Sequence, residues 1–204
     1  MPGAPWFWLV AGPNGAGKTS SARKLLGEVL EIVNPDVFAA RLSPHAPENA
    51  ALGAGREAIK RTRILIAQGG TFAVETTLSG RSFAATVRLA QSRGFSVGLI
   101  YIGLASARLA IARVRDRRTR GGHDVPAQDV RRRYVRGLRN LSGFAVIADR
   151  ALFFDNSSST HPLRRILELN DGERIFRQAR LPTWIRRAPG MADLYRSNPG
   201  PRGR

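Results

Sequence analysis

The chain has 204 residues, 43% of them hydrophobic, which fits one α/β domain with a core of its own. It has no cysteine, and this excludes disulfide bonds and thiolate metal sites. Its formal net charge is +18, from 33 basic and 15 acidic residues, and only three of the basic residues are lysines. Such a charge indicates a polyanionic partner, namely nucleotide phosphates, nucleic acid or an acidic protein, or else a solvated arginine-rich surface.

The apolar segments are too short for a membrane protein. No stretch approaches the ~20 apolar residues that a membrane-spanning helix needs. The first apolar run, Trp6–Ala11, is shorter than a signal-peptide core and has no basic residue before it. We therefore expect a cytoplasmic protein without membrane contacts.

Short apolar runs alternate with helical patterns along most of the chain. The expected strands are Trp6–Ala11, Glu31–Asp36, Thr71–Thr76, Phe95–Ile102 and Ala151–Asp155. The expected helices are Lys18–Leu30, Glu48–Gln68, Ser82–Arg93, Ser106–Arg118 and a segment that starts at Pro126. Asn170-Asp171-Gly172, between two short runs, predicts a small C-terminal β-hairpin.

This alternation predicts an α/β fold with a mostly parallel five-stranded sheet and helices on both faces. We expect one domain over residues 1–185. Residues 186–204 are rich in proline, glycine, arginine and serine, which predicts a disordered basic tail. Ligands of parallel sheets bind beyond the carboxyl ends of the strands, so polar residues at those ends are the candidates for a site.

A glycine-rich segment follows the first expected strand and matches the pattern G-x-x-x-x-G-K-[ST]. In this pattern, backbone N–H groups and the next helix N-terminus surround phosphates. Lys18 would reach the β- and γ-phosphates, and Thr19 would bind Mg²⁺. The predicted nucleotide-binding residues are Gly12, Pro13, Asn14, Gly15, Ala16, Gly17, Lys18, Thr19 and Ser20. The pattern predicts a P-loop NTPase fold that binds a nucleotide and Mg²⁺, and by itself it does not choose between a kinase, a GTPase and a motor.

Other features separate the classes of P-loop protein. The chain lacks an N-K-x-D motif for guanine, and Asp155 is followed by Asn156 instead of a second acid. Asp36, at the end of the second expected strand, could accept the proton of an attacking hydroxyl, or it could form only an Asx turn after Asn34-Pro35. Together these features favour a kinase with an alcohol acceptor.

Glu75 and Thr76 end the third expected strand. A carboxylate beside hydroxyl side chains is suited to bind a substrate hydroxyl or a water molecule held on magnesium. The alternative is that Glu75 only caps a helix or a turn.

Residues 108–139 contain 11 arginines and only three acidic residues. Arg113, Arg117 and Arg120 fall on one helix face. Guanidinium groups neutralise charge in phosphoryl transfer, and Gly121-Gly122 between two arginine-rich helices suggests a lid over about residues 106–140. The alternative is that most of these arginines are simply solvated. We expect about two of them to act in catalysis.

Five blocks of sequence together resemble the zeta-toxin family of P-loop kinases, in its compact branch. They are AGPNGAGKTS, the NPD of Asn34–Asp36, FAVETTLSG, RGGHDVP with VRRRY, and FFDNS. The resemblance covers Trp6 to about Ser158. It implies an ATP-dependent phosphotransferase whose acceptor is a hydroxyl of a UDP-N-acetyl amino sugar.

The resemblance also implies roles for single residues. Lys18, Asp36, Arg117 and Arg133 would be catalytic, with Asp36 as the base. Asn156 would lie on the adenine side of the nucleotide. Glu75, Thr76, Arg120 and His123 would bind the substrate, although His123 could equally cap the lid helix.

The family also makes an acidic antitoxin a possible partner. Two alternatives stay open at this point. One is a kinase or ATPase directed at nucleic acid, which the charge favours but which no known nucleic-acid module supports. The other is a nucleotide-binding toxin that acts through a protein partner.

Overall fold

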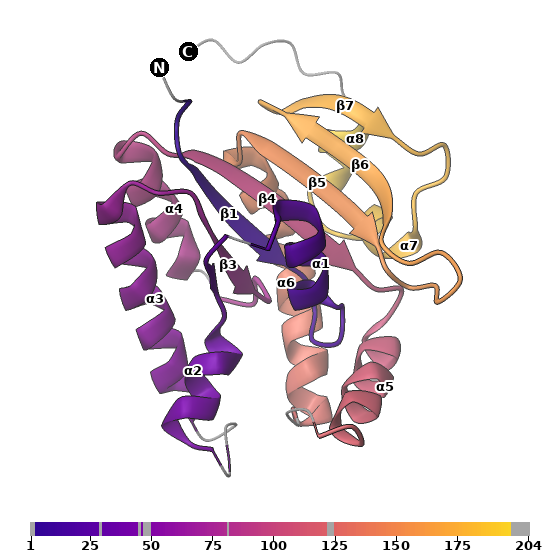
Figure 1. Cartoon of the computed structure of the whole chain (residues 1–204). Coiled ribbons are helices and arrows are strands. Elements are labelled where there is room, and N and C mark those ends of the chain that lie inside the picture. The colour runs from indigo at the N-terminus through magenta and orange to yellow at the C-terminus, as the bar shows by residue number, and fades with distance from the viewer. Residues whose placement is uncertain are drawn as a thin grey trace.

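The computed structural model describes residues 3–28, 30–44, 46, 50–80, 82–121 and 125–196. Its strands are β1 (Trp6–Ala11), β2 (Ile32–Val33), β3 (Phe72–Thr76), β4 (Ser96–Gly103), β5 (Arg150–Asp155), β6 (Arg164–Asn170) and β7 (Glu173–Arg177). Its helices are α1 (Lys18–Leu26), α2 (Pro35–Leu42), α3 (Ala51–Gln68), α4 (Ser82–Ser92), α5 (Ala107–Arg118), α6 (Ala127–Ile147), α7 (Thr183–Arg186) and α8 (Met191–Arg196). Figure 1 shows them arranged around a single twisted sheet.

The sheet has the strand order β2-β3-β1-β4-β5-β6-β7. The first five strands in this order are parallel, as the sequence predicts, and β6 and β7 form the predicted antiparallel hairpin. The hairpin is not a separate unit, because β6 pairs with β5 and so extends the same sheet to seven strands.

Both faces of the sheet are buried, as expected for parallel strands. Alternate residues of β1 belong to different cores: Phe7 and Leu9 face one, and Val10 faces the other. The larger core lies under α3, α4, α6, α7 and α8. The smaller one lies under α1 and the inner face of α5, and Figure 1 shows α1 in front of the sheet and α4 and α6 behind it.

The predicted second strand is wrong over its second half. Only Ile32–Val33 pair with β3, and a helix begins at Pro35. Proline suits the first helical position, and the Asn34 side chain caps the helix by accepting a hydrogen bond from the Asp36 N–H at 2.9 Å. Asp36 therefore lies in the first turn of α2 instead of at a strand end.

The predicted disordered tail is wrong for residues 186–196, because α8 packs on the larger core. Met191 is fully buried, and Trp184 of the preceding α7 is buried as well. The Trp184 indole N–H donates to Asp155 Oδ1 at 3.0 Å, and its ring contacts Tyr101. The domain thus continues past residue 185, while residues 197–204 lie outside the described part of the chain.

The arginine-rich region forms two helices, α5 and α6, which pack against each other through Val114 and Val130. The expected glycine break falls between them, and Gly121 has a positive φ of 82°. Gly122 and His123 lie outside the described residues, so the role predicted for His123 stays a prediction. None of the helices described is long and apolar enough to cross a membrane.

Candidate active site

The glycine-rich loop leaves β1 at its carboxyl end and leads into α1. Gly12 has a φ of 145°, and a Cβ at this position would lie 2.3 Å from the Ile102 carbonyl oxygen of β4. Gly15 has a φ of 75°, and its Cβ would lie 2.9 Å from the Ala110 carbonyl oxygen of α5. Both positions require glycine for conformation and for space, so the loop has the shape of an anion-binding nest against β4 and α5.

Lys18 is the first residue of α1, and its side chain folds back over the loop. Its ammonium donates a hydrogen bond to the Pro13 carbonyl oxygen at 3.1 Å. Burial lowers the pKa of Lys18 below its usual range, and the charges of Arg117 and Arg133 lower it further, while Glu75 and Asp36 act in the opposite direction. A desolvated cation beside backbone N–H groups is suited to bind phosphate oxygens.

Glu75 lies on β3, opposite Val10 of β1, and points toward the phosphate loop. The Thr19 hydroxyl donates to Glu75 Oε2 at 3.1 Å. Glu75 is only 4% exposed, and its Oε1 is buried without a hydrogen-bond partner among the residues that the structure describes. Burial raises the pKa of Glu75, the nearby Asp36 raises it further, and Lys18, Thr19 and Arg117 oppose the shift. The sequence predicts a substrate contact for Glu75, but the carboxylate lies against Thr19, the predicted metal ligand.

Charged groups from four other elements surround Lys18 of α1. The charges that act on it come from Glu75 of β3, Asp36 of α2, Arg117 of α5 and Arg133 of α6. Asp36 is exposed, and both arginines are half-buried. The other three predicted catalytic residues, which come from three different helices, therefore lie near enough to Lys18 for their charges to act on it.

Thr76 shapes the loop that follows β3. Its hydroxyl accepts a hydrogen bond from the Leu78 N–H at 3.1 Å, and Leu78 has a φ of 52°, which is unusual for a branched residue. Asn140 of α6 donates to the Leu78 carbonyl oxygen at 2.7 Å. A Cβ on Gly137 would lie 2.6 Å from the Thr77 carbonyl oxygen. Sequence reasoning missed both α6 residues, since only the tertiary structure pairs them with this loop.

The two remaining predicted positions are placed differently. Asn156 follows β5, and its side chain hydrogen-bonds the phosphate loop itself, at the Ala16 carbonyl oxygen. Arg120 is exposed in the turn after α5, and its backbone N–H donates a hydrogen bond to the Arg117 carbonyl oxygen. Its predicted substrate contact stays a prediction.

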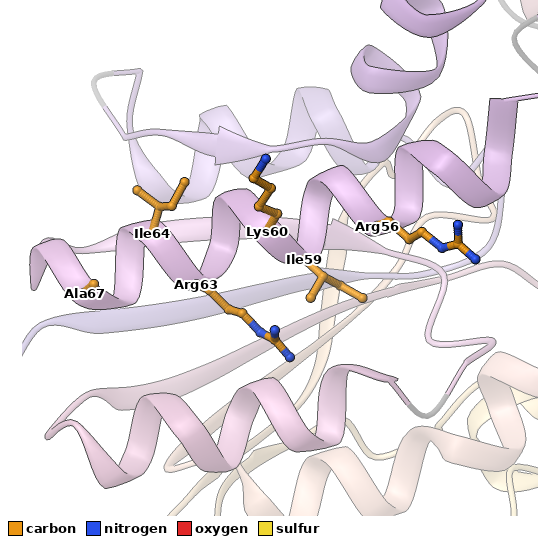
Figure 2. A pocket seen from close by; sticks show the side chains of 6 residues that line it. All are labelled: Arg56, Ile59, Lys60, Arg63, Ile64 and Ala67. Carbon is orange, nitrogen blue, oxygen red and sulfur yellow. The ribbon is translucent and has the colours of Figure 1, made fainter.

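A separate hollow of about 530 Å³ runs along α3 (Figure 2). It is lined by Arg56, Ile59, Lys60, Arg63, Ile64 and Ala67. None of these is a predicted site residue, so the hollow does not coincide with the candidate active site.

One protein-family model covers the part of the chain that holds most of this site. The family model AAA_33, described as "AAA domain", matches residues 7–136, which include the phosphate loop, Asp36, Glu75, Arg117 and Arg133. This match covers more than half of the chain. The protein belongs to the AAA_33 family. An uncharacterized protein of Haemophilus influenzae is 36% identical over 124 residues, which are 60% of this chain and 88% of the relative.

Solved structures share the fold of this AAA_33 protein at low sequence identity. The AvrRxo1-ORF1:-ORF2 structure with ATP has a TM-score of 0.70 at 18% identity and covers 96% of the chain. The protein spans only 63% of that AvrRxo1 chain. The PezAT chromosomal toxin-antitoxin system of Streptococcus pneumoniae matches with a TM-score of 0.56 at 18% identity, over 81% of this chain and 72% of that one. The fold is therefore that of P-loop kinase-like proteins, and toxins are among those that share it.

Proposed function

We propose that the protein is a phosphotransferase that moves the γ-phosphate of ATP to a hydroxyl of a small molecule. One observation carries the proposal: the charges of Asp36, Glu75, Arg117 and Arg133, which come from four different elements, all act on Lys18 beside the phosphate loop. A proton acceptor, two guanidinium groups and a phosphate-binding lysine are the parts that phosphoryl transfer needs.

The phosphate loop and Lys18 bind and orient the donor. Backbone N–H groups of the loop and the N-terminus of α1 would hold the phosphates, and the Lys18 ammonium would neutralise charge on the β- and γ-oxygens. ATP as the donor is supported by the P-loop pattern, and by ATP in the AvrRxo1 structure that shares the fold.

The Thr19 hydroxyl and the buried Glu75 carboxylate fit a magnesium ion. They are oxygen donors, and the orphaned Oε1 of Glu75 gains a partner if a cation or its water binds there. Magnesium, when bound, supplies positive charge against the β- and γ-phosphate oxygens. Glu75 holds Thr19 in place, directly or through a bound water, at the strand next to β1.

Asp36, Arg117 and Arg133 act on the transferred group. The exposed Asp36 carboxylate accepts the proton of the attacking hydroxyl, which forms the new O–P bond as the bond to the β-phosphate oxygen breaks. Arg117 and Arg133 neutralise the charge on the equatorial oxygens and on the departing phosphate. The helix start that Asn34 caps fixes the backbone of Asp36.

The acceptor class follows from the zeta-toxin resemblance, which points to a UDP-N-acetyl amino sugar. The exposed arginines of α5 and α6 offer positive charge for such a diphosphate. An acidic antitoxin is a further part of this proposal, supported by the net charge of +18 and by the two neighbours that come from two-component assemblies.

The test is ATP turnover with Mg²⁺ and a panel of acceptors, read by mass spectrometry. The panel contains UDP-N-acetylglucosamine, other UDP-sugars, the free sugars and a single-stranded oligonucleotide with a 5′-hydroxyl. We expect a gain of one phosphoryl group on a UDP-sugar, and no gain with Lys18→Ala. Transfer only to the oligonucleotide would instead assign the protein to nucleic-acid kinases, and no transfer to any acceptor would contradict the proposal.

A further inference from the structure

We infer that Asn156 is a positioning residue that fixes the phosphate loop in its anion-binding shape and couples it to the connection between β5 and β6. This role differs from the place on the adenine side of the nucleotide that the family resemblance implies. The inference rests on the proposed nucleotide binding for its functional consequence, but its structural part stands on the contacts of Asn156 alone.

Asn156 makes three hydrogen bonds to three separate segments. Its Nδ2 donates to the Ala16 carbonyl oxygen at 2.9 Å, and its Oδ1 accepts from the Leu163 N–H at 2.9 Å. Its backbone N–H donates to the Gly103 carbonyl oxygen at the end of β4, at 3.0 Å. The residue therefore joins the phosphate loop, the end of β4 and the β5–β6 connection.

The orientation of the Asn156 amide is fixed by its partners. A backbone carbonyl can only accept and a backbone N–H can only donate, so the NH₂ group must face Ala16 and the oxygen must face Leu163. Each end of the amide has a partner. Both ends of the side chain are held by backbone atoms of this chain, so the geometry favours a structural task.

The bond to Ala16 controls where the next N–H points. In a planar trans peptide, the carbonyl of Ala16 and the N–H of Gly17 point in opposite directions. Holding the carbonyl outward, toward Asn156, turns the Gly17 N–H to the inner side of the loop, where phosphate binds. Gly17 has a φ of 81°, and a Cβ there would lie 3.3 Å from Asn156 Nδ2, so glycine also leaves room for this bond.

The bond to Leu163 controls the other segment. Leu163 has a φ of 51°, an uncommon conformation for a branched residue, which the surrounding structure must hold in place. By accepting the Leu163 N–H, Asn156 closes the connection that runs over residues 157–162. A single side chain thus makes the shape of the phosphate loop depend on that connection.

Asparagine is the side chain that matches these partners. Aspartate keeps the acceptor for Leu163, but it loses the donor to Ala16 and adds a negative charge beside the phosphate nest. Alanine loses both bonds. We therefore expect Asn156→Asp to weaken nucleotide binding more than Asn156→Ala, although aspartate is closer in shape.

The first test uses the free protein and needs no ligand. Amide hydrogen exchange, read by mass spectrometry, should rise several-fold in peptides from both 12–20 and 157–163 in Asn156→Ala. The matched control is Ser158→Ala, which removes the exposed hydroxyl that accepts from Thr160 and His161 without touching Asn156. The control should loosen only residues 157–163. Unchanged exchange of the phosphate loop in folded Asn156→Ala or Asn156→Asp would overturn the inference.

The second test separates positioning from base reading. Calorimetric titration with ADP and with GDP should give, for Asn156→Ala, an affinity loss of about tenfold that is equal for the two nucleotides, the size expected when the one hydrogen bond that Asn156 makes to the phosphate loop is lost. A loss confined to ADP would mean that Asn156 reads the base and would overturn the inference. Failure of the wild-type protein to bind any nucleotide would contradict the proposed function instead, while the exchange result would still decide the structural coupling.

Discussion

The two halves of the candidate site are built in different ways. In the phosphate-binding half, Gly12, Lys18, Thr19 and Glu75 are joined by close backbone approaches and hydrogen bonds on and beside the sheet. In the transfer half, Asp36, Arg117 and Arg133 come from the helices α2, α5 and α6, and their side chains are exposed or half-buried. The first half has its shape from contacts within the protein, whereas the second brings charges from three helices to act on Lys18. The two halves should therefore respond differently to substitution.

The largest expected effect comes from the transfer half. Replacing Arg117 or Arg133 by lysine keeps the charge but removes the planar fork that binds two phosphate oxygens. Each change should lower kcat about 10²–10³-fold, with little change in nucleotide affinity or melting temperature. Steady-state kinetics with the best acceptor of the panel measures this effect.

The control for the arginine variants is Arg132→Lys, next to Arg133 on α6. Arg132 is ion-paired with Asp129 at 2.9 Å and is exposed, so its replacement should leave kcat unchanged. Equal losses of kcat in all three variants would mean that the overall positive charge of α5 and α6 supports transfer, and that no two specific guanidinium groups do.

The next effect should appear in the phosphate-binding half, as lost stability. Gly12→Ala puts a methyl group against the backbone of Ile102 at a φ of 145°, and should cost about 3 kcal/mol of unfolding free energy together with nucleotide binding. Gly69→Ala is the matched control, since Gly69 is in the left-handed region at a φ of 75°, but a Cβ there would have no atom of the described residues within 4 Å. It should cost about 1 kcal/mol. Denaturant titrations of both variants measure the difference, and equal costs would contradict the close approach.

A smaller effect is expected from replacing Glu75 by glutamine, which should raise the stability of the protein and lower its activity. Burial raises its pKa above the ordinary 4.5, so the folded state binds this proton more tightly than the unfolded chain does. The ionised carboxylate therefore costs stability once the pH rises from 4.5 through the raised pKa. Glu75→Gln should raise the melting temperature at pH 7.5 by about 2–4 °C, the equivalent of ~1 kcal/mol in a domain of this size, while it lowers Mg²⁺-dependent turnover.

Melting curves at two pH values test whether the raised pKa of Glu75 causes the higher melting temperature of Glu75→Gln. The advantage of Glu75→Gln should shrink at about pH 5, where the wild-type carboxyl is more protonated and resembles the amide. An advantage of equal size at both pH values, or a more stable wild type at the higher pH, would contradict a raised pKa as the cause.

The phosphate-binding half is more fully predictable from the sequence than the transfer half. Its loop is a continuous pattern, so the pattern alone names the residues that form it. The Thr19–Glu75 contact has no such local pattern, because it joins residues 56 apart through the pairing of β1 with β3. The helix at Pro35 has a local signal, an asparagine cap before a proline, but the apolar run before it favours a strand end instead.

The C-terminal segment shows the limit of composition as evidence. Proline, glycine and arginine dominate residues 186–204, yet Met191 and Tyr195 are spaced four apart and both are buried. Two apolar residues at helical spacing are too weak a signal by themselves, and the core they cover is formed by distant segments. The hairpin is a similar case: Asn170-Asp171-Gly172 predicts the turn, but nothing local predicts the pairing of β6 with β5.

The most direct test of the central claim measures binding and transfer in the same two variants. Calorimetry gives the ATP affinity, and mass spectrometry gives the phosphorylated acceptor, for Lys18→Ala and Asp36→Asn. Lys18→Ala should lose both. Asp36→Asn should bind ATP like the wild type and transfer phosphate about 10²–10⁴-fold more slowly, because only the proton acceptor is gone. Transfer at the wild-type rate in Asp36→Asn would contradict a kinase with Asp36 as its base.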